Sequence, residues 1–517
     1  MNLDKKINLI FINNFILKIA LLILFILSLI NLVVFSGNWS GDPEIHLVFS
    51  KNLINGNFLQ FNPGEMTSGN TSPIYMIILS ILLKILPDIW VPFIMKLFSL
   101  SSIIALSFLV SKELCNKLLI KNNLYLLFIL FSFLSLPFIF FQGWLGMENS
   151  FFGLIYVYLV IKVFKNKIFS NNKINASNLK WFTAIYLLFF LRPEIIFFIF
   201  SVTIYFFVRN DYKIFILGLF FTLLAFFTPR LFEFIFSVPL HGAGEIRALL
   251  SKISSYQFNF LGKEIFINDK PFRLILYYFG FVTCIIVFFK KNFIKNYKKI
   301  IFLIASSVVP WFLHVINILP NFHFSRYSIY FFFIFIILFF EFIDIDKIKK
   351  KINFFVIIIL LSSLFSFFIE HYKRDIWFER ILNTKNYNNI THKLDINTRE
   401  EFSEKICKKI NCTKQPINIG IFEVQIRLIL DNRFIVRSLD GVVDYKLSNY
   451  IDKNGINIID YIKFRKIDYL FDIKKTYFNN DRFSLHTLKK LEVGEKLTID
   501  KIIFQRIDKD IIKITRL

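Results

Sequence analysis

The sequence predicts a multi-pass α-helical membrane protein with a C-terminal α/β or α+β domain outside the membrane. Composition predicts the membrane part, because the 517 residues are 55% hydrophobic with 70 phenylalanines and the mean hydropathy is +0.56, well above an ordinary soluble domain. Long apolar runs also alternate with short lysine clusters. This alternation is typical of membrane helices joined by cytoplasmic loops.

The net charge of +25 does not indicate a nucleic-acid partner. The 62 lysines and arginines exceed the 37 acidic residues, but they gather in the loops between apolar runs, as the positive-inside rule expects. We therefore expect membrane lipid around the chain and no nucleic acid. The first apolar run lacks a small-residue cleavage site, so we interpret it as an anchor and not as a signal peptide.

A spanning helix needs about 20 apolar residues. Lys5 and Lys6 place the N-terminus in the cytoplasm, and a helix over 15–36 then carries the chain to the outer side. The apolar piece at 72–86 is too short to cross comfortably, so we expect it to lie half inserted on the outer leaflet. A pair of shorter helices is predicted over 181–208, with its turn at LRPE. Single helices are predicted over 93–111, 124–141, 151–164, 213–229, 273–289, 299–317, 327–342 and 353–369. The total is about 11 crossings.

An odd number of crossings leaves the tail outside the membrane. From residue 371 the apolar runs shorten to strand length and charges appear throughout. We therefore divide the chain into a membrane domain over 1–370, with its first outer loop at 37–92, and an extracytoplasmic domain over 371–517. We expect the protein in the inner (plasma) membrane.

The pair Cys407 and Cys412, in CKKINC, lies in the predicted outer domain. An oxidising compartment permits a disulfide there, and two free thiols are the alternative.

Charged residues at membrane depth cost at least about 2.5 kcal/mol each and are therefore functional candidates. Asp42 directly follows the first helix, and Glu148, in the short turn GMEN, is expected on the same outer side. The alternative for Asp42 is a solvated helix cap. Arg192 and Glu194 flank the proline of LRPE, where the alternative is a plain ion pair. Arg326 lies in SRYS, where the alternative is an interfacial anchor.

Carboxylates and arginines on one side of a membrane predict a polar pocket for a lipid-linked anion. A guanidinium binds phosphate in a bidentate way. Carboxylates repel phosphate and are suited to another task, such as taking the proton of a sugar hydroxyl. No two of the histidines His46, His241, His314 and His323 have metal-ligand spacing within a helix, so the histidines predict no metal site.

Five stretches resemble, in order, the GT-C superfamily of polyprenyl-phosphate-sugar-dependent membrane glycosyltransferases. The first is GDPEIHLVFSKNLINGNFLQFNPGEMTSGNTSPIY at 41–75, which is similar to the family's first outer loop. The others are GMENSFF, LRPE, the pair RY at 326–327 and the tail segment at 419–444. The terminal arabinofuranosyltransferase branch is the most similar in motif.

The resemblance implies an inverting hexosyl- or pentosyltransferase that takes a polyprenyl-phosphate-linked sugar donor and a glycan or glycolipid acceptor. Asp42 would be the catalytic base and Glu148 would orient the acceptor. Arg326, with Arg192 second, would stabilise the departing phosphate. Glu194, Glu44 and His46 are the further substrate-binding candidates that go with these motifs.

The cofactor and the base are left open. The family's first acidic pair is Gly41 and Asp42 in this chain, with Glu44 nearby, so Glu44 and Glu148 are the alternatives to Asp42 as base. The resemblance makes no cofactor certain, and the alternatives are none or a divalent cation held by Asp42 with Glu148. Two other functions compete: a flippase for lipid-linked sugars, which would favour an inverted repeat that the sequence does not display, and a glycan-binding membrane scaffold.

Overall fold

The computed structural model describes most of the helices and much of the tail. The described residues are 3–36, 41–67, 69–70, 72–120, 122–165, 168–169, 176–238, 240, 293–315, 329–342, 352–372, 396–410, 412, 416–421, 427, 430–439, 444–452, 455–471, 488, 491–508 and 511–517.

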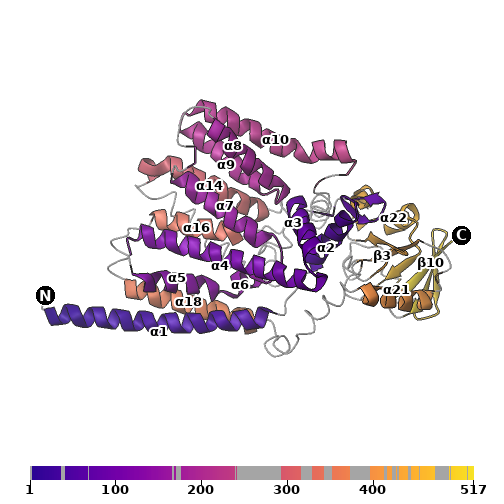
Figure 1. Cartoon of the computed structure of the whole chain (residues 1–517), viewed down its shortest axis with the longest axis horizontal. Coiled ribbons are helices and arrows are strands. Elements are labelled where there is room, and N and C mark those ends of the chain that lie inside the picture. Colours follow the sequence, from indigo (N-terminus) through magenta and orange to yellow (C-terminus); the bar gives the residue numbers. More distant parts are fainter. Residues whose placement is uncertain are drawn as a thin grey trace.

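Most of the described chain is helical, and its helices lie side by side in one body, here called the helical part (Figure 1). It comprises α1 (Leu3–Ser36), α4 (Val91–Lys117), α5 (Asn123–Leu134), α6 (Pro137–Gly143), α7 (Asn149–Phe164), α8 (Ala176–Leu187), η2 (Leu188–Phe190), α9 (Ile195–Val208), α10 (Tyr212–Phe236), α14 (Phe293–Val315), α16 (Ile329–Phe342) and α18 (Ile352–Tyr372).

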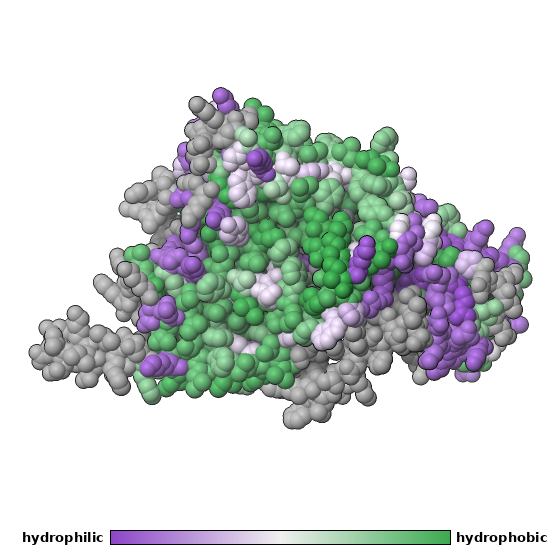
Figure 2. Space-filling view, viewed as in Figure 1, coloured by the Kyte–Doolittle hydropathy of each residue, from purple (hydrophilic) through white to green (hydrophobic). Residues whose placement is uncertain are grey.

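Three helical stretches are long and apolar enough to cross a membrane, namely Phe15–Val34, Val91–Lys117 and Tyr212–Phe236. On the face shown in Figure 2, hydrophobic side chains cover the helical part, and hydrophilic ones gather over the C-terminal part and at the opposite ends of the helices. This distribution is compatible with a membrane protein. The number of crossings and their direction stay predictions.

The predicted helices map onto this body with one division. The helix expected over 124–141 is split into α5 and α6, because Leu136 precedes Pro137 and a residue before proline avoids the helical conformation. Leu136 accordingly has φ −77° and ψ 115°. The expected pair of shorter helices on either side of LRPE is present as α8 with η2 and as α9. The helix expected over 273–289 lies outside the described residues.

The first loop folds between the helical part and the tail (Figure 1). It contains α2 (Gly41–Ile54), β1 (Gln60–Asn62), β2 (Glu65–Met66), α3 (Pro73–Ile85) and η1 (Asp88–Trp90). At 13 residues α3 is shorter than a spanning helix. Two serines join it to α2: Ser50 Oγ donates to the Met76 carbonyl at 3.0 Å, and Ser80 Oγ donates to the Ser50 carbonyl at 3.1 Å.

The C-terminal residues 396–517, here called the sheet part, form a six-stranded mixed sheet with the order β4-β3-β7-β10-β9-β8. The first three of these strands are parallel and the others antiparallel. The strands are β3 (Ile417–Ile421), β4 (Phe434–Ser438), β7 (Tyr469–Phe471), β8 (Lys496–Ile499), β9 (Ile502–Asp508) and β10 (Ile511–Arg516), with β5 (Ile451–Asp452) and β6 (Gly455–Ile456) as a separate pair and helices α21 (Ile396–Ile410), η4 (Tyr445–Tyr450) and α22 (Ile458–Arg465). Cys407, in α21, and Cys412 are joined by a disulfide.

The motif FNPGE fastens the first loop to the edge of this sheet. Pro63 and Gly64 form the turn between β1 and β2, and Gly64 has φ +84°, as the third position of a type II turn requires. Asn62 then pairs with the outer edge of β4: its Nδ2 donates to the Val436 carbonyl at 2.8 Å, and its Oδ1 accepts from the Val436 N–H at 2.9 Å. The asparagine amide thus replaces a neighbouring strand at this edge.

A group of ion pairs surrounds this contact. Glu65 accepts from Arg437 and, at 2.7 Å, from Arg465. Arg465 also bonds Asp444, whose second oxygen accepts from Tyr461 at 2.8 Å. We call Glu65, Arg437, Asp444 and Arg465 the junction network, because it ties the first loop to the sheet part.

Candidate functional site

Three stretches that are far apart in the sequence meet at one buried point. They are α2, the GMEN turn before α7, and the LRPE turn before α9. The ionisable side chains that meet there are His46, Glu148, Arg192 and Glu194, which we call the site cluster. His46, Glu148 and Arg192 are 3%, 0% and 5% exposed, so the site cluster is enclosed by the helices.

Arg192 stands between two carboxylates. Its Nη1 donates to Glu148 Oε1 at 2.9 Å, and its Nε donates to Glu194 Oε2 at 3.0 Å. A second bond joins Nη2 to Glu194. The proline between Arg192 and Glu194 interrupts the helix, so that both side chains project from a turn. The ion pair that the sequence leaves as an alternative is therefore present, and it extends to Glu148.

His46 contacts the other oxygen of the same carboxylate. Its Nε2 lies 3.5 Å from Glu148 Oε2, which is longer than a normal hydrogen bond. The ring packs edge-on against Tyr75, with centroids 5.5 Å apart. Tyr75 Oη donates to the Gly146 carbonyl at 2.8 Å and so holds the GMEN turn against α3. Burial and the Glu148 carboxylate raise the pKa of Tyr75 well above 10.0, so this hydroxyl stays a donor.

Several buried polar atoms at this point have no hydrogen-bond partner in the described part of the chain. They include His46 Nδ1, Glu148 Oε2 and both polar atoms of the Asn149 amide. A buried polar atom left without a partner costs about 1–3 kcal/mol, and folded proteins rarely keep several together without a reason. The arrangement can accept a hydrogen bond at Glu148 Oε2 while Arg192 fixes the position of that carboxylate.

The remaining candidates are placed less completely. Glu44 lies on α2 two residues before His46 and is also buried, at 3% exposure. Asp42 lies in the first turn of α2, and its side chain is outside the described structure. Arg326 falls outside the described residues. The structure therefore unites four of the predicted site residues and fixes the helix that carries two more.

Three further residues were missed by the sequence analysis. Tyr75 and Asn149 lie within quoted motifs, SPIY and GMEN, but no rule singles them out. Lys96 had a clear signal, because it is a lone charge in the apolar run VPFIMKLFSL. It is 2% exposed, and its Nζ lies 5.9 Å from the ring centre of Trp144, close to the GMEN turn.

Over the described residues, no three histidine, cysteine or acidic side chains gather into a group that could hold a metal ion. A cation shared by Asp42 and Glu148 depends on a side chain outside that set and stays an alternative.

No family model matches this chain, and no curated protein matches it. The resemblance to the GT-C glycosyltransferases therefore rests on the five motifs alone.

Proposed function

We propose that the protein is a membrane glycosyltransferase that moves a sugar from a polyprenyl-phosphate donor to a glycan or glycolipid acceptor on the outer side of the membrane. The observation that carries the proposal is the site cluster. Three of the five motifs contribute an ionisable side chain to it, and Glu148 Oε2 lacks a hydrogen-bond partner among the described residues. A site for a hydroxylated substrate needs an acceptor atom of this kind.

The proposed reaction is a single inverting displacement. The acceptor hydroxyl oxygen forms a bond to the anomeric carbon, the bond from that carbon to the phosphate oxygen breaks, and the lipid phosphate leaves with the electron pair. Asp42 takes the hydroxyl proton as general base. Glu148, held by Arg192, orients the acceptor through Oε2. Glu44 and Glu148 are the next candidates for the base, and both are buried.

The phosphate is assigned to Arg326 first. Arg192 already bonds Glu148 and Glu194, and a phosphate placed beside it would be repelled by both carboxylates. This favours a positioning role for Arg192, with phosphate binding as its second role. His46 and Glu194 complete the wall of the pocket. A reaction without a cofactor and one with a divalent cation held by Asp42 and Glu148 both stay open.

The proposed topology keeps the N-terminus in the cytoplasm, about 11 crossings in the inner (plasma) membrane, and the sheet part outside. Direct contact between His46 and Glu148 supports a shared side for α2 and the GMEN turn, whether or not α3 crosses. A flippase and a glycan-binding scaffold are the rival functions. Neither breaks a glycosidic bond, so a transfer assay separates both from the enzyme.

The test is complementation of a deletion strain, followed by analysis of its envelope glycans. Cells without the gene should lack one terminal sugar, and the wild-type gene should restore it. Asp42→Asn and Glu148→Gln preserve shape but remove a carboxylate, and each should lower transfer by at least about 10²-fold in membranes with normal amounts of folded protein.

Glu113→Gln is the matched control. Glu113 pairs with Lys165 at 2.6 Å, at the ends of α4 and α7 opposite to the site cluster, so this variant should transfer like wild type. Full transfer by folded Asp42→Asn would move the base to Glu44 or Glu148. Full transfer by every carboxylate variant, Glu44→Gln included, would refute the assigned catalytic site, and unchanged envelope glycans in the deletion strain would refute the enzyme.

A further inference from the structure

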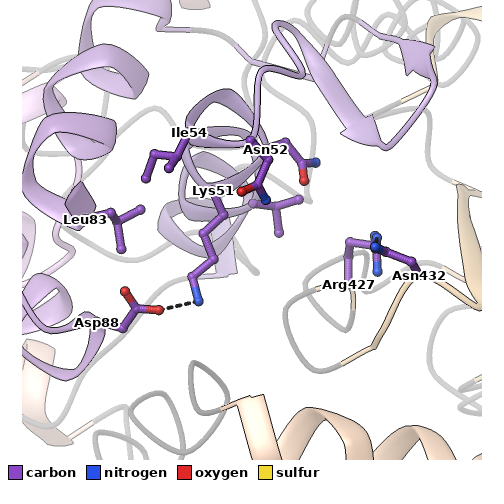
Figure 3. Close-up of a pocket in the computed structure, with 9 residues that line it drawn as sticks. Lys51, Asn52, Ile54, Leu83, Asp88, Arg427 and Asn432 are labelled. Atoms are coloured by element: carbon purple, nitrogen blue, oxygen red, sulfur yellow. Dashed lines mark hydrogen bonds and ion pairs between the residues drawn. The ribbon is translucent and has the colours of Figure 1, made fainter.

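A cavity of about 320 Å³ lies where α2 ends against the sheet part (Figure 3). Its α2 side is lined by Val48, Lys51, Asn52 and Asn55, which share one helical face because their spacing is i, i+3, i+4 and i+7. Arg427 and Asn432, from the sheet part, face them across the gap. The volume is that of a small-ligand site.

The charged side chains that line this cavity already have polar partners. Lys51 Nζ lies 2.6 Å from Asp88 Oδ2 (Figure 3). Arg427 donates to the carbonyls of Leu430 and Asp431 at 2.8 Å and 3.0 Å, and to Asn432 Oδ1 at 3.0 Å. These hydrogen bonds of Arg427 therefore stabilise the conformation of the residues just before β4. An anion entering the cavity would meet the Asp88 carboxylate beside Lys51, so the lining does not favour one.

Amides dominate the remaining polar surface. Asn52 Nδ2 donates hydrogen bonds to the carbonyls of Gln60 and Phe61, at 2.7 Å and 3.0 Å. The Oδ1 atom of Asn52 can therefore accept a hydrogen bond from a ligand. Asn55 and Asn432 add further amide groups. An amide both donates and accepts, as a hydroxyl does. This chemistry matches a neutral ligand that carries several hydroxyl groups.

The cavity and the proposed reaction centre share one rigid helix. A rise of 1.5 Å per residue places Asn52 about 9 Å along α2 from His46 and about 15 Å from Asp42. We infer that the cavity binds a neutral sugar residue of the acceptor, behind the residue that receives the new sugar. The identification of this saccharide as part of the acceptor rests on the proposed function. The preference for a neutral saccharide rests on the cavity alone.

The test measures binding without any donor. The probe is a labelled mixture of neutral oligosaccharides released from the envelope of the producing cells, added to the purified full chain in detergent. Asn55→Trp should fill the cavity from an exposed turn and weaken binding by at least about tenfold. Asn57→Trp, in the same loop but away from the cavity, is the matched control and should bind like wild type.

Asn432→Asp is a second, nearly isosteric variant. It keeps an oxygen for Arg427 and removes one amide donor, so binding should weaken several-fold in a protein that folds normally. Inorganic phosphate should not displace the probe. Absence of oligosaccharide binding by the wild type, undiminished binding by Asn55→Trp, or displacement by phosphate would each overturn the inference.

Glu148→Gln separates this inference from the proposed function, because Glu148 does not line the cavity. The variant should lose transfer and still bind the probe. Suppose that Glu148→Gln and Asp42→Asn both kept full transfer, while Asn55→Trp lost binding. The saccharide site would then be supported and the assigned catalytic residues would be wrong.

Discussion

The site cluster and the junction network both pair arginines with carboxylates, and they differ in how many of the carboxylate oxygens accept hydrogen bonds. In the junction network all four carboxylate oxygens of Glu65 and Asp444 accept hydrogen bonds. In the site cluster Glu148 Oε2 accepts none from the described residues, although Glu148 is fully buried and Glu65 is partly exposed. Satisfied ion pairs fasten two parts of a chain together. A buried oxygen that keeps its acceptor capacity is available to a ligand.

One stretch of sequence, GDPEIHLVFSKNLINGNFLQFNPGE, serves both regions. Its first half delivers Glu44 and His46 to the helical part, and its last residues bind the sheet part. The resemblance implies roles for Asp42, Glu44 and His46 in this stretch and none for its last residues. The structure assigns Asn62 and Glu65 to the junction.

The largest effect is expected from Arg192→Met, which would leave the buried Glu148 and the partly buried Glu194 without their cation. Loss of one partner of a buried ion pair costs about 3–5 kcal/mol, so thermal unfolding in detergent should begin at a much lower temperature. Adding Glu148→Gln should recover part of the loss, because one uncompensated charge is then gone.

Lys463→Met is the control for this experiment. Lys463 pairs with Asp460 at 3.8 Å in the sheet part, but its side chain is 42% exposed, and such surface pairs contribute at most about 1 kcal/mol. Equal losses in the two variants would contradict the distinction between a buried and an exposed pair.

A smaller effect is expected from Asn62→Ala at the junction. The substitution leaves the N–H and carbonyl of Val436 without their partner, and each such loss costs about 1–3 kcal/mol where water cannot replace it. Hydrogen exchange at β4 should therefore accelerate, while the site cluster keeps its protection. Asn57→Ala, in the same loop, should leave β4 unchanged. Slow exchange in Asn62→Ala would show that the sheet part is held by other contacts.

The smallest effect is a pH dependence of the junction. Burial opposes ionisation of Glu65, but Arg437 and Arg465 outweigh it and hold the pKa of this carboxyl below 4.5. Because the pKa of Glu65 is lowered in the folded state, Glu65 contributes fully to the stability of the junction above about pH 4.5. This contribution is lost as the pH falls through the pKa of the folded state. Protection of β4, corrected for intrinsic exchange, should decrease in that range.

Glu65→Gln isolates this contribution. Arg433 likewise lowers the pKa of Asp431, against the effect of burial. This second source of acid sensitivity is the same in the wild type and in Glu65→Gln. The wild type should therefore lose more protection on acidification than Glu65→Gln does. Identical pH profiles would exclude Glu65 as the acid-sensitive group of the junction.

Local sequence determined the elements. Apolar runs and prolines predicted α1, α4, α10 and the turn at LRPE, because hydropathy and proline geometry act on neighbouring residues. The break at Pro137 was readable from the same rule and was overlooked in favour of one long crossing. Charges in apolar surroundings also pointed to Glu148, Arg192 and Glu194 without any knowledge of their partners.

Tertiary structure decided the pairings. No sequence rule relates His46 to Glu148, or Asn62 to Val436, since these contacts span about 100 residues in one case and 374 in the other. The strand order of the mixed sheet and the cavity at the end of α2 also depend on contacts between residues that are far apart in the sequence. Such contacts depend on how whole helices and strands pack to bury their apolar faces, and that packing is a property of the assembled chain and not of any short segment.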